Sequence, residues 1–121
     1  MVKDEITFPD FQKLDLRVGE VVEAEKVVES KHLIRMTVDL GSDYGVRTIF
    51  AGVADWYTPT QLTGKKFVFV ANLEPKKMPS FAKATADERS ESQGMMCAAD
   101  VGNKAVLIPV GKKIPKGAIV R

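Results

Sequence analysis

The stretch from residue 16 to residue 28 constrains the fold of this chain most strongly. It is rich in valine, which alternates with glutamate and lysine, and this composition predicts one long β-strand. Gly19 lies inside it, and an isolated glycine in a strand marks a bend or a bulge. A long bent strand that serves two halves of a sheet is typical of small barrels.

Further strands are expected at regular spacing along the chain. They are residues 33–40, 46–51, 66–71, 95–99, 105–110 and 117–120. In the first of these, Leu33, Met36, Val38 and Leu40 are expected on the buried face, with Ile34 out of step. Turn residues at 41–45 predict a hairpin loop. So many strands with little helix indicate an all-β, antiparallel barrel.

Two short helical segments are also expected. Ile6, Phe8, Phe11 and Leu14 follow a near-helical spacing around Pro9, which predicts an amphipathic turn covering one end of the barrel. Residues 54–62 are a short polar connector with a helical turn.

Bulk properties limit the functions that the chain could perform. Its 121 residues predict one domain over 1–121, and the net charge of +2 restricts any nucleic-acid site to a local patch. A single cysteine and a single histidine leave no disulfide framework, no ordinary zinc site and no nucleophile with its base. We therefore expect a buried structural thiol at Cys97, and no catalytic site, metal or cofactor. Without a signal peptide or membrane segment, a cytoplasmic location is expected.

Two motifs gather polar chemistry beside apolar strands. Residues 71–77 are Ala-Asn-Leu-Glu-Pro-Lys-Lys, and residues 91–95 are Glu-Ser-Gln-Gly-Met. If the two segments pair, their polar groups meet at one rim of the sheet. The rim then offers lysines for phosphate, amides and a hydroxyl for hydrogen bonds, and a thioether for packing on a base. Such a surface suits single-stranded or looped RNA better than catalysis.

These motifs resemble the tRNA-binding domain family, and so do residues 11–19, 38–41, 47–54 and 57–65. The family includes stand-alone tRNA-binding proteins and the C-terminal domain of many methionyl-tRNA synthetases. The resemblance implies an OB-fold, a five-stranded Greek-key barrel with short terminal additions, that binds tRNA by its shape without catalysis. It also implies a homodimer formed through apolar residues near the chain ends, and a free-standing protein or an accessory that partners an aminoacyl-tRNA synthetase. The apolar residues concerned are Ile6, Phe8, Ile114, Ile119 and Val120.

Candidate tRNA-binding residues follow from the motifs and from the resemblance. They are Arg35, Arg47, Asn72, Lys76, Lys77, Ser92, Gln93 and Met95, with His32 as a further candidate. The resemblance places Asn72, Lys76, Ser92 and Met95 at positions of tRNA contact, and His32 where many members have lysine. From the residues alone, Arg35 and Arg47 form either one cationic patch or two solvated arginines, and Asn72 is either a ligand or a turn-stabilising amide.

The segment 79–90 separates the two motifs. It is polar and alanine-rich, and the family has a shorter loop here, so the segment is predicted to be a flexible insertion of about ten residues. A rival function is that of the secretion chaperones, a branch of the same fold family whose dimers hold unfolded polypeptide. The Ala-Gly-Val-Ala and Ser-x-Gly-Met signatures of this chain favour tRNA instead.

Overall fold

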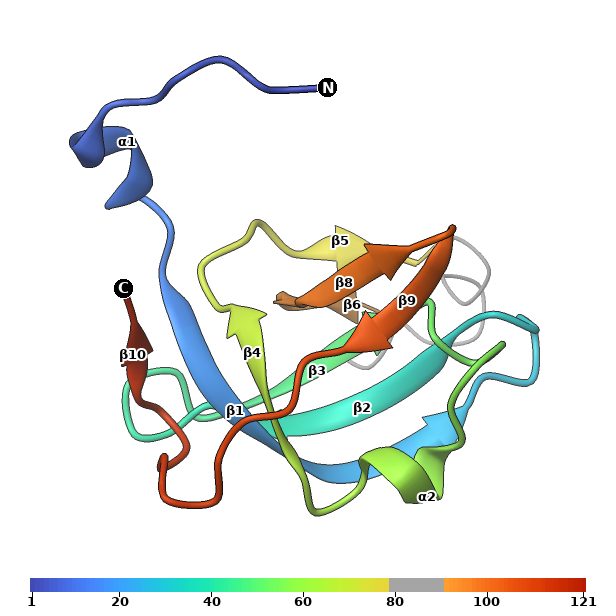
Figure 1. Ribbon diagram of the computed structural model, residues 1–121. Helices are drawn as coiled ribbons and strands as arrows, with labels where there is room; N and C mark the ends of the chain where they lie inside the picture. The colour runs from blue at the N-terminus through green and yellow to red at the C-terminus, as the bar shows by residue number, and fades with distance from the viewer. Residues whose placement is uncertain (79–90) are drawn as a thin grey trace.

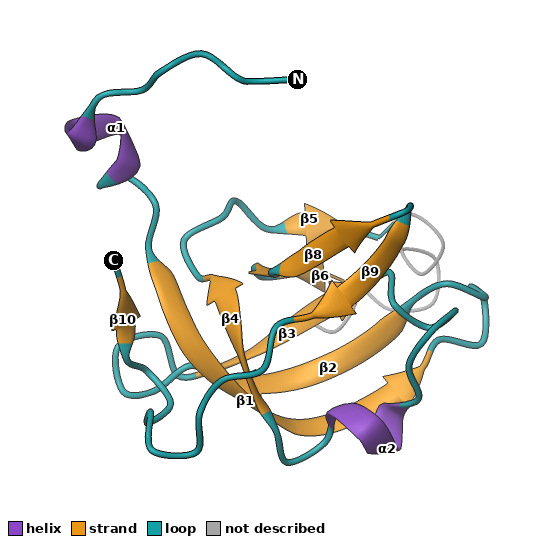
Figure 2. Ribbon diagram, viewed as in Figure 1, coloured by secondary structure: helices purple, strands orange, loops and turns teal. Residues whose placement is uncertain are grey.

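The computed structural model describes residues 1–78 and 91–121 (Figure 1). Five antiparallel strands form a nearly closed barrel in the spatial order β3-β2-β1-β4-β7 (Figure 2). The strands are β1 (Leu16–Lys26), β2 (Ile34–Asp39), β3 (Val46–Ala51), β4 (Lys66–Val70) and β7 (Met95–Met96). The predicted all-β barrel of the OB type is confirmed. The predicted insertion at 79–90 lies outside the described residues.

Strand β1 belongs to both halves of the barrel, as its length predicted. Its first part, through Glu20, pairs with β4, and its part from Glu20 onward pairs with β2. The bulge, however, lies between Val21 and Glu23 rather than at Gly19. A Cβ atom at Gly19 would lie 2.7 Å from Val38 Cγ1 and 2.8 Å from Phe69 Cδ1. Glycine is needed there because the side chains of Val38 and Phe69 occupy the space that a Cβ atom would take.

The core lies inside the barrel and corrects the expected phase of β2. Ile34, Met36 and Val38 are fully buried, whereas Leu33 is only partly buried. Alternation with a period of two includes Ile34 and puts Leu33 on the outer face. There Leu33 packs against a small second cluster of Val27 and Phe50.

Two small sheets, one further strand and a short helix are added to the barrel. Strands β5 (Lys76–Lys77) and β6 (Glu91–Ser92) form one two-stranded sheet, and β8 (Ala98–Val101) and β9 (Lys104–Leu107) form another. Strand β10 (Ile119–Val120) pairs with the start of β1, and helix α2 (Pro59–Leu62) buries Leu62. The expected single strand 95–99 is therefore two strands, because the chain turns from β4 to β9 at Cys97.

Helix α1 (Phe8–Phe11) does not cover the barrel end, contrary to the prediction. It has no buried residue, and the N-terminal segment stands away from the barrel (Figure 1). Thr7 Oγ1 caps the helix by accepting from Asp10 N. The apolar spacing predicted an amphipathic helix, but such spacing does not indicate which surface the apolar face of the helix contacts. Neither described helix is long and apolar enough to cross a membrane.

Candidate nucleic-acid interface

The barrel is closed beside β3 by the segment that holds the second motif. Gln93 N donates to Thr48 O at 2.7 Å, and Thr48 N donates to Gln93 Oε1 at 2.9 Å. Ser92 Oγ accepts from Phe50 N at 3.0 Å and donates to Gly94 O at 3.1 Å. Ser92 is only 8% exposed. Both side chains thus satisfy backbone groups at the open edge of β3.

Gly94 gives this closure its tight geometry and leads to Met95. Its φ is +152°, and a Cβ atom would lie 3.0 Å from Val70 O and 3.1 Å from Ile49 Cδ1. Only glycine fits so close to the strand backbone. Met95 follows opposite Val70 with 48% of its surface exposed, which leaves its thioether free to pack on a ligand.

The two motifs pair, which the sequence had left open. Lys76 lies opposite Ser92, and Lys77 lies opposite Glu91. Both lysines are exposed at this edge. The pairing places the two lysines beside residues 91 and 92, which lead directly into Gln93 and Met95.

Asn72 uses both ends of its amide to tie the chain together. Its Oδ1 accepts from Asp15 N at 2.9 Å, and its Nδ2 donates to Lys13 O at 2.7 Å. The amide thus anchors the loop after β4 to the segment that precedes β1. This is the turn-stabilising arrangement that the sequence left open beside RNA contact, and an exposed lysine, Lys13, lies at its end.

Tyr44 lies against two guanidinium groups at one end of the barrel. Arg17 Cζ and Arg47 Cζ are 5.3 Å and 5.5 Å from the centroid of its ring. Arg47 Nε donates to Tyr44 O at 3.1 Å, and Tyr44 Oη donates to Asp15 Oδ2 at 2.6 Å. Cation–π contact and these hydrogen bonds hold Arg47 in place. Sequence patterning had not singled out Tyr44, because Asp15 and Arg17 lie far from it along the chain.

Asp15 is the electrostatic centre of this end. Its carboxylate accepts from Arg17 Nε at 2.7 Å, and this hydrogen bond, followed by that of Tyr44, holds the pKa of Asp15 below its ordinary value. Arg17 Nη1 also donates to Asp43 Oδ2 at 2.9 Å. The hydrogen bond to the Asp15 carboxylate, and then burial, raise the pKa of Tyr44. The charge of Arg17 is thus balanced by the carboxylates of Asp15 and Asp43, whereas Arg47 has no ion pair among the described residues.

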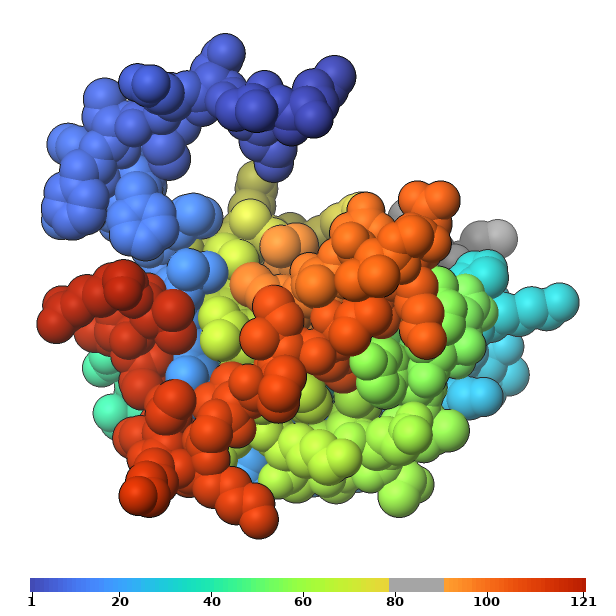
Figure 3. All heavy atoms as spheres, in the orientation of Figure 1, coloured from blue at the N-terminus to red at the C-terminus, as the bar shows by residue number. Residues whose placement is uncertain are grey.

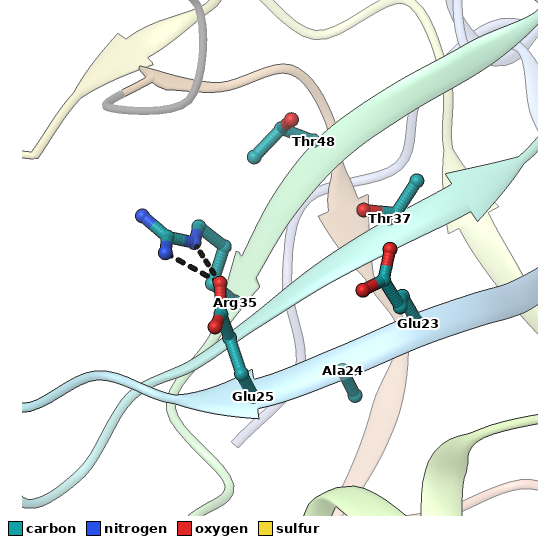
Figure 4. A pocket seen from close by; sticks show the side chains of 6 residues that line it. All are labelled: Glu23, Ala24, Glu25, Arg35, Thr37 and Thr48. Atoms are coloured by element: carbon teal, nitrogen blue, oxygen red, sulfur yellow. Dashed lines mark hydrogen bonds and ion pairs between the residues drawn. The ribbon is translucent and has the colours of Figure 1, made fainter.

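Arg35 lies elsewhere. It is opposite Phe50 in the β2–β3 pairing, whereas Arg47 is opposite the buried Val38, so the two arginines are on opposite faces of the hairpin. Arg35 lines a hollow of about 270 Å³ on the outer face, with Glu23 and Glu25 (Figure 4). Its Nε donates to Glu25 Oε1 at 2.9 Å. The register does not join Arg35 and Arg47 into the single cationic patch that the sequence allowed.

His32 is at the other end of β3 from Arg47. Its Nδ1 lies 2.8 Å from Asp55 Oδ2, and its backbone O accepts from Ala54 N at 3.0 Å. Cys97 is partly buried, and burial raises the pKa of its thiol, which suits a structural role. Among the described residues, no three His, Cys, Asp or Glu side chains converge as metal ligands would.

The structure thus gathers most of the candidates on connected elements. We call the surface formed by Arg47, Gln93, Met95, Lys76 and Lys77 the β3–β5 rim. Its parts are linked by the hydrogen bonds between Thr48 and Gln93 and by the pairing of β5 with β6. Ser92 lies beneath this rim, while Arg35 and His32 lie away from it.

This architecture is that of an OB-type barrel with an exposed polar rim. The chain belongs to the family described as putative tRNA binding domain, whose model matches residues 16–118. It is 43% identical to the methionine–tRNA ligase of Archaeoglobus fulgidus over 98% of its own length, and 44% identical to that of Thermotoga maritima over 95%. The chain spans only 16% of each of these relatives.

Solved structures agree with this assignment. A MetRS-related protein from Pyrococcus horikoshii superposes with a TM-score of 0.83 at 40% identity, over 98% of this chain and 100% of that one. The chaperone CsaA from Bacillus anthracis superposes with a TM-score of 0.79 at 27% identity, over 98% of this chain and 100% of that one.

Proposed function

We propose that this domain binds tRNA through the β3–β5 rim, recognising the shape of the folded RNA and performing no catalysis itself. Arg47 and the paired lysines would contact phosphates, while Gln93 and Met95 would contact sugars and bases. The bound tRNA would be presented to an aminoacyl-tRNA synthetase, either from a free-standing protein or from a domain joined to the enzyme. We expect this to occur in the cytoplasm.

One observation supports the location of the site above the others. The β5–β6 pairing and the Thr48–Gln93 hydrogen bonds connect Lys76 to the strand that bears Arg47. Cations held on adjacent rigid elements can follow an RNA backbone at a fixed spacing, and backbone contacts do not depend on base sequence. Arg47 is further held by Tyr44, which lowers the entropy that its ordering would cost on binding.

Filter binding tests this function directly. The purified protein is titrated with a folded tRNA, an RNA duplex and an unstructured single strand, each at two salt concentrations. We expect the tRNA to bind most tightly and its affinity to fall steeply with salt, because phosphate contacts release counterions. Equal affinity for all three RNAs would contradict shape recognition, and no binding to any of them would contradict the function.

The likeness to CsaA favours a second candidate, the holding of unfolded polypeptide. It rests on the superposition at 27% identity, weaker than the 40% identity to the MetRS-related protein. Suppression of the aggregation of a chemically denatured protein, measured by turbidity, distinguishes the two. Suppression that tRNA does not compete away would support the chaperone.

A further inference from the structure

A shallow groove runs from Met95 toward the only tryptophan in the chain. Two adjoining cavities, of about 330 and 210 Å³, share Gly52, Ala98 and Ala105 as lining. Met95 lines the smaller one, and Trp56 lines the larger. The larger falls at the lower end of the volumes typical of small-ligand sites. We call this surface the Trp56 groove.

The two walls of the groove are held rigidly against each other. One wall is the β8–β9 hairpin, whose turn has φ of +58° at Gly102 and +66° at Asn103, as in a tight two-residue hairpin turn. The other wall is the segment after β3, and Tyr57 Oη joins the two by accepting from Leu107 N at 3.1 Å. In Figure 3 the orange hairpin lies beside the green atoms of this segment. A ligand would thus enter a preformed slot.

The larger cavity of the groove is lined by two kinds of residue. Its apolar lining is Gly52, Ala98, Ala99, Ala105 and Trp56, and Trp56 is 37% exposed. Asp100, Asn103 and Lys104 stand around it. Among the described residues, none of these three side chains has a hydrogen bond or an ion pair, so all are available to a ligand.

We propose that the Trp56 groove binds one unpaired RNA base, which stacks on the indole while Lys104 contacts the adjoining phosphate. Small lining residues leave room for a flat ring, and an exposed aromatic side chain is the usual platform for an unpaired base. The Asp100 carboxylate and the Asn103 amide can pair with the amino and carbonyl groups of a base edge. The proposal rests on the proposed function, because Met95 connects the groove to the β3–β5 rim.

An unpaired base fits these observations better than a segment of polypeptide does. Unfolded polypeptide needs deep apolar pockets for bulky side chains, whereas the larger cavity is lined by glycine, alanine and polar side chains around Trp56. The cation at Lys104 complements a phosphate backbone.

Trp56 fluorescence tests the proposal with no added label, because the chain has one tryptophan. The probes are tRNA, a six-residue adenine RNA, the same backbone without bases, and a blunt RNA duplex. We expect the tRNA and the hexamer to quench the emission, and the abasic strand and the duplex to leave it nearly unchanged. Quenching by the abasic strand equal to that by the hexamer would overturn base stacking.

Substitutions give a second readout. Trp56→Ala should weaken tRNA binding roughly 5- to 150-fold, the usual effect of losing one stacked base, while Trp56→Phe keeps most of the affinity. Gly52→Leu should block the groove without unfolding the protein, because a Cβ atom there would meet no other atom within 4 Å and the backbone has room for a side chain. Val28→Ala removes exposed apolar surface outside the groove and should change nothing. Thermal unfolding checks the fold of each variant.

The outcomes separate this proposal from the function on which it rests. If Trp56→Ala and Gly52→Leu bind tRNA as tightly as the wild type, the groove is not a base site, and tRNA binding through the rim stands. If the wild type binds no tRNA in the filter assay, both are overturned. If an unfolded polypeptide quenches Trp56 and the RNAs do not, the groove is a polypeptide site and the proposal is wrong.

Discussion

The hydroxyl oxygen of Ser92 lies 3.0 Å from the backbone nitrogen of Phe50 and accepts its hydrogen bond inside the protein. The same hydroxyl donates to Gly94 O, so one small side chain satisfies both a donor and an acceptor at the seam of the barrel. Ser92 therefore belongs to the framework beneath the β3–β5 rim, although its motif suggested a contact with RNA.

Ser92→Ala should lower the free energy of unfolding by about 1–3 kcal/mol, the cost of leaving a buried polar group unpaired. Urea unfolding followed by circular dichroism measures this. Ser42→Ala, which removes an exposed hydroxyl in the β2–β3 loop, is the control and should have little effect. A stable Ser92→Ala protein that loses tRNA affinity would instead show that the hydroxyl contacts RNA.

Charge reversal tests the β3–β5 rim. Arg47→Glu and Lys76→Glu should each weaken tRNA binding by about tenfold or more, because a charged hydrogen bond to phosphate is lost. The slope of log affinity against log salt should fall by about one for each contact removed. The loss should be similar for different tRNA species. Lys26→Glu, at an exposed site on the far part of β1, is the matched control. Unchanged binding in both rim variants would place the site elsewhere.

Low pH should lower the free energy of unfolding, because protonation of Asp15 removes the stabilising contacts of its carboxylate with Arg17 and Tyr44. The pKa of this carboxyl is lowered chiefly by its hydrogen bond from Arg17, so its contribution to stability is complete above the ordinary aspartate pKa of about 3.9. That contribution is lost as the pH falls below this value and through the folded-state pKa. The difference in unfolding free energy between the wild type and Asp15→Asn should therefore be constant near neutrality and shrink below about pH 4.

Tyr44→Phe is the companion variant for this measurement. It removes the 2.6 Å hydrogen bond to Asp15 and keeps the ring against both guanidinium groups. Its difference from the wild type should show the same dependence on pH with a smaller amplitude. A difference between the wild type and Asp15→Asn that does not vary from pH 7 to pH 2 would contradict the assignment.

The domain should form a homodimer through its exposed terminal apolar residues. Ile6, Phe8, Ile114 and Ile119 are all exposed in the single chain, and no residue of α1 is buried. Light scattering at micromolar concentration should give the mass of two chains. Ile119→Asp should shift it to one chain, whereas Val28→Asp, at another exposed site, should not. A mass of one chain for the wild type would refute the dimer.

Much of the barrel was predictable because strand alternation and turn residues are local. The expected strands are present, except that the stretch 95–99 is divided between two strands, and the sequence left open whether the two motifs pair. The errors occurred where the role of a residue depends on a partner far away in the sequence. The spacing of Phe8 and Phe11 predicted a helix, but whether that helix contacts the barrel depends on the direction in which the chain runs before Asp15. Gly19 was expected to bend β1, but its lack of a side chain makes room for Val38 and Phe69.

The sequence by itself determined which residue types stand near the rim, and its motifs identified the family. Only the tertiary structure decided what each of them does. Asn72 and Ser92 are bound to groups 57 and 42 residues away, so no local pattern could show that their hydrogen bonds hold the chain together. The register of β2 with β3 separated Arg35 from Arg47 by turning their side chains to opposite faces. Long-range pairing assigns each polar group its partner, and that assignment divides the framework of the site from the surface that can meet RNA.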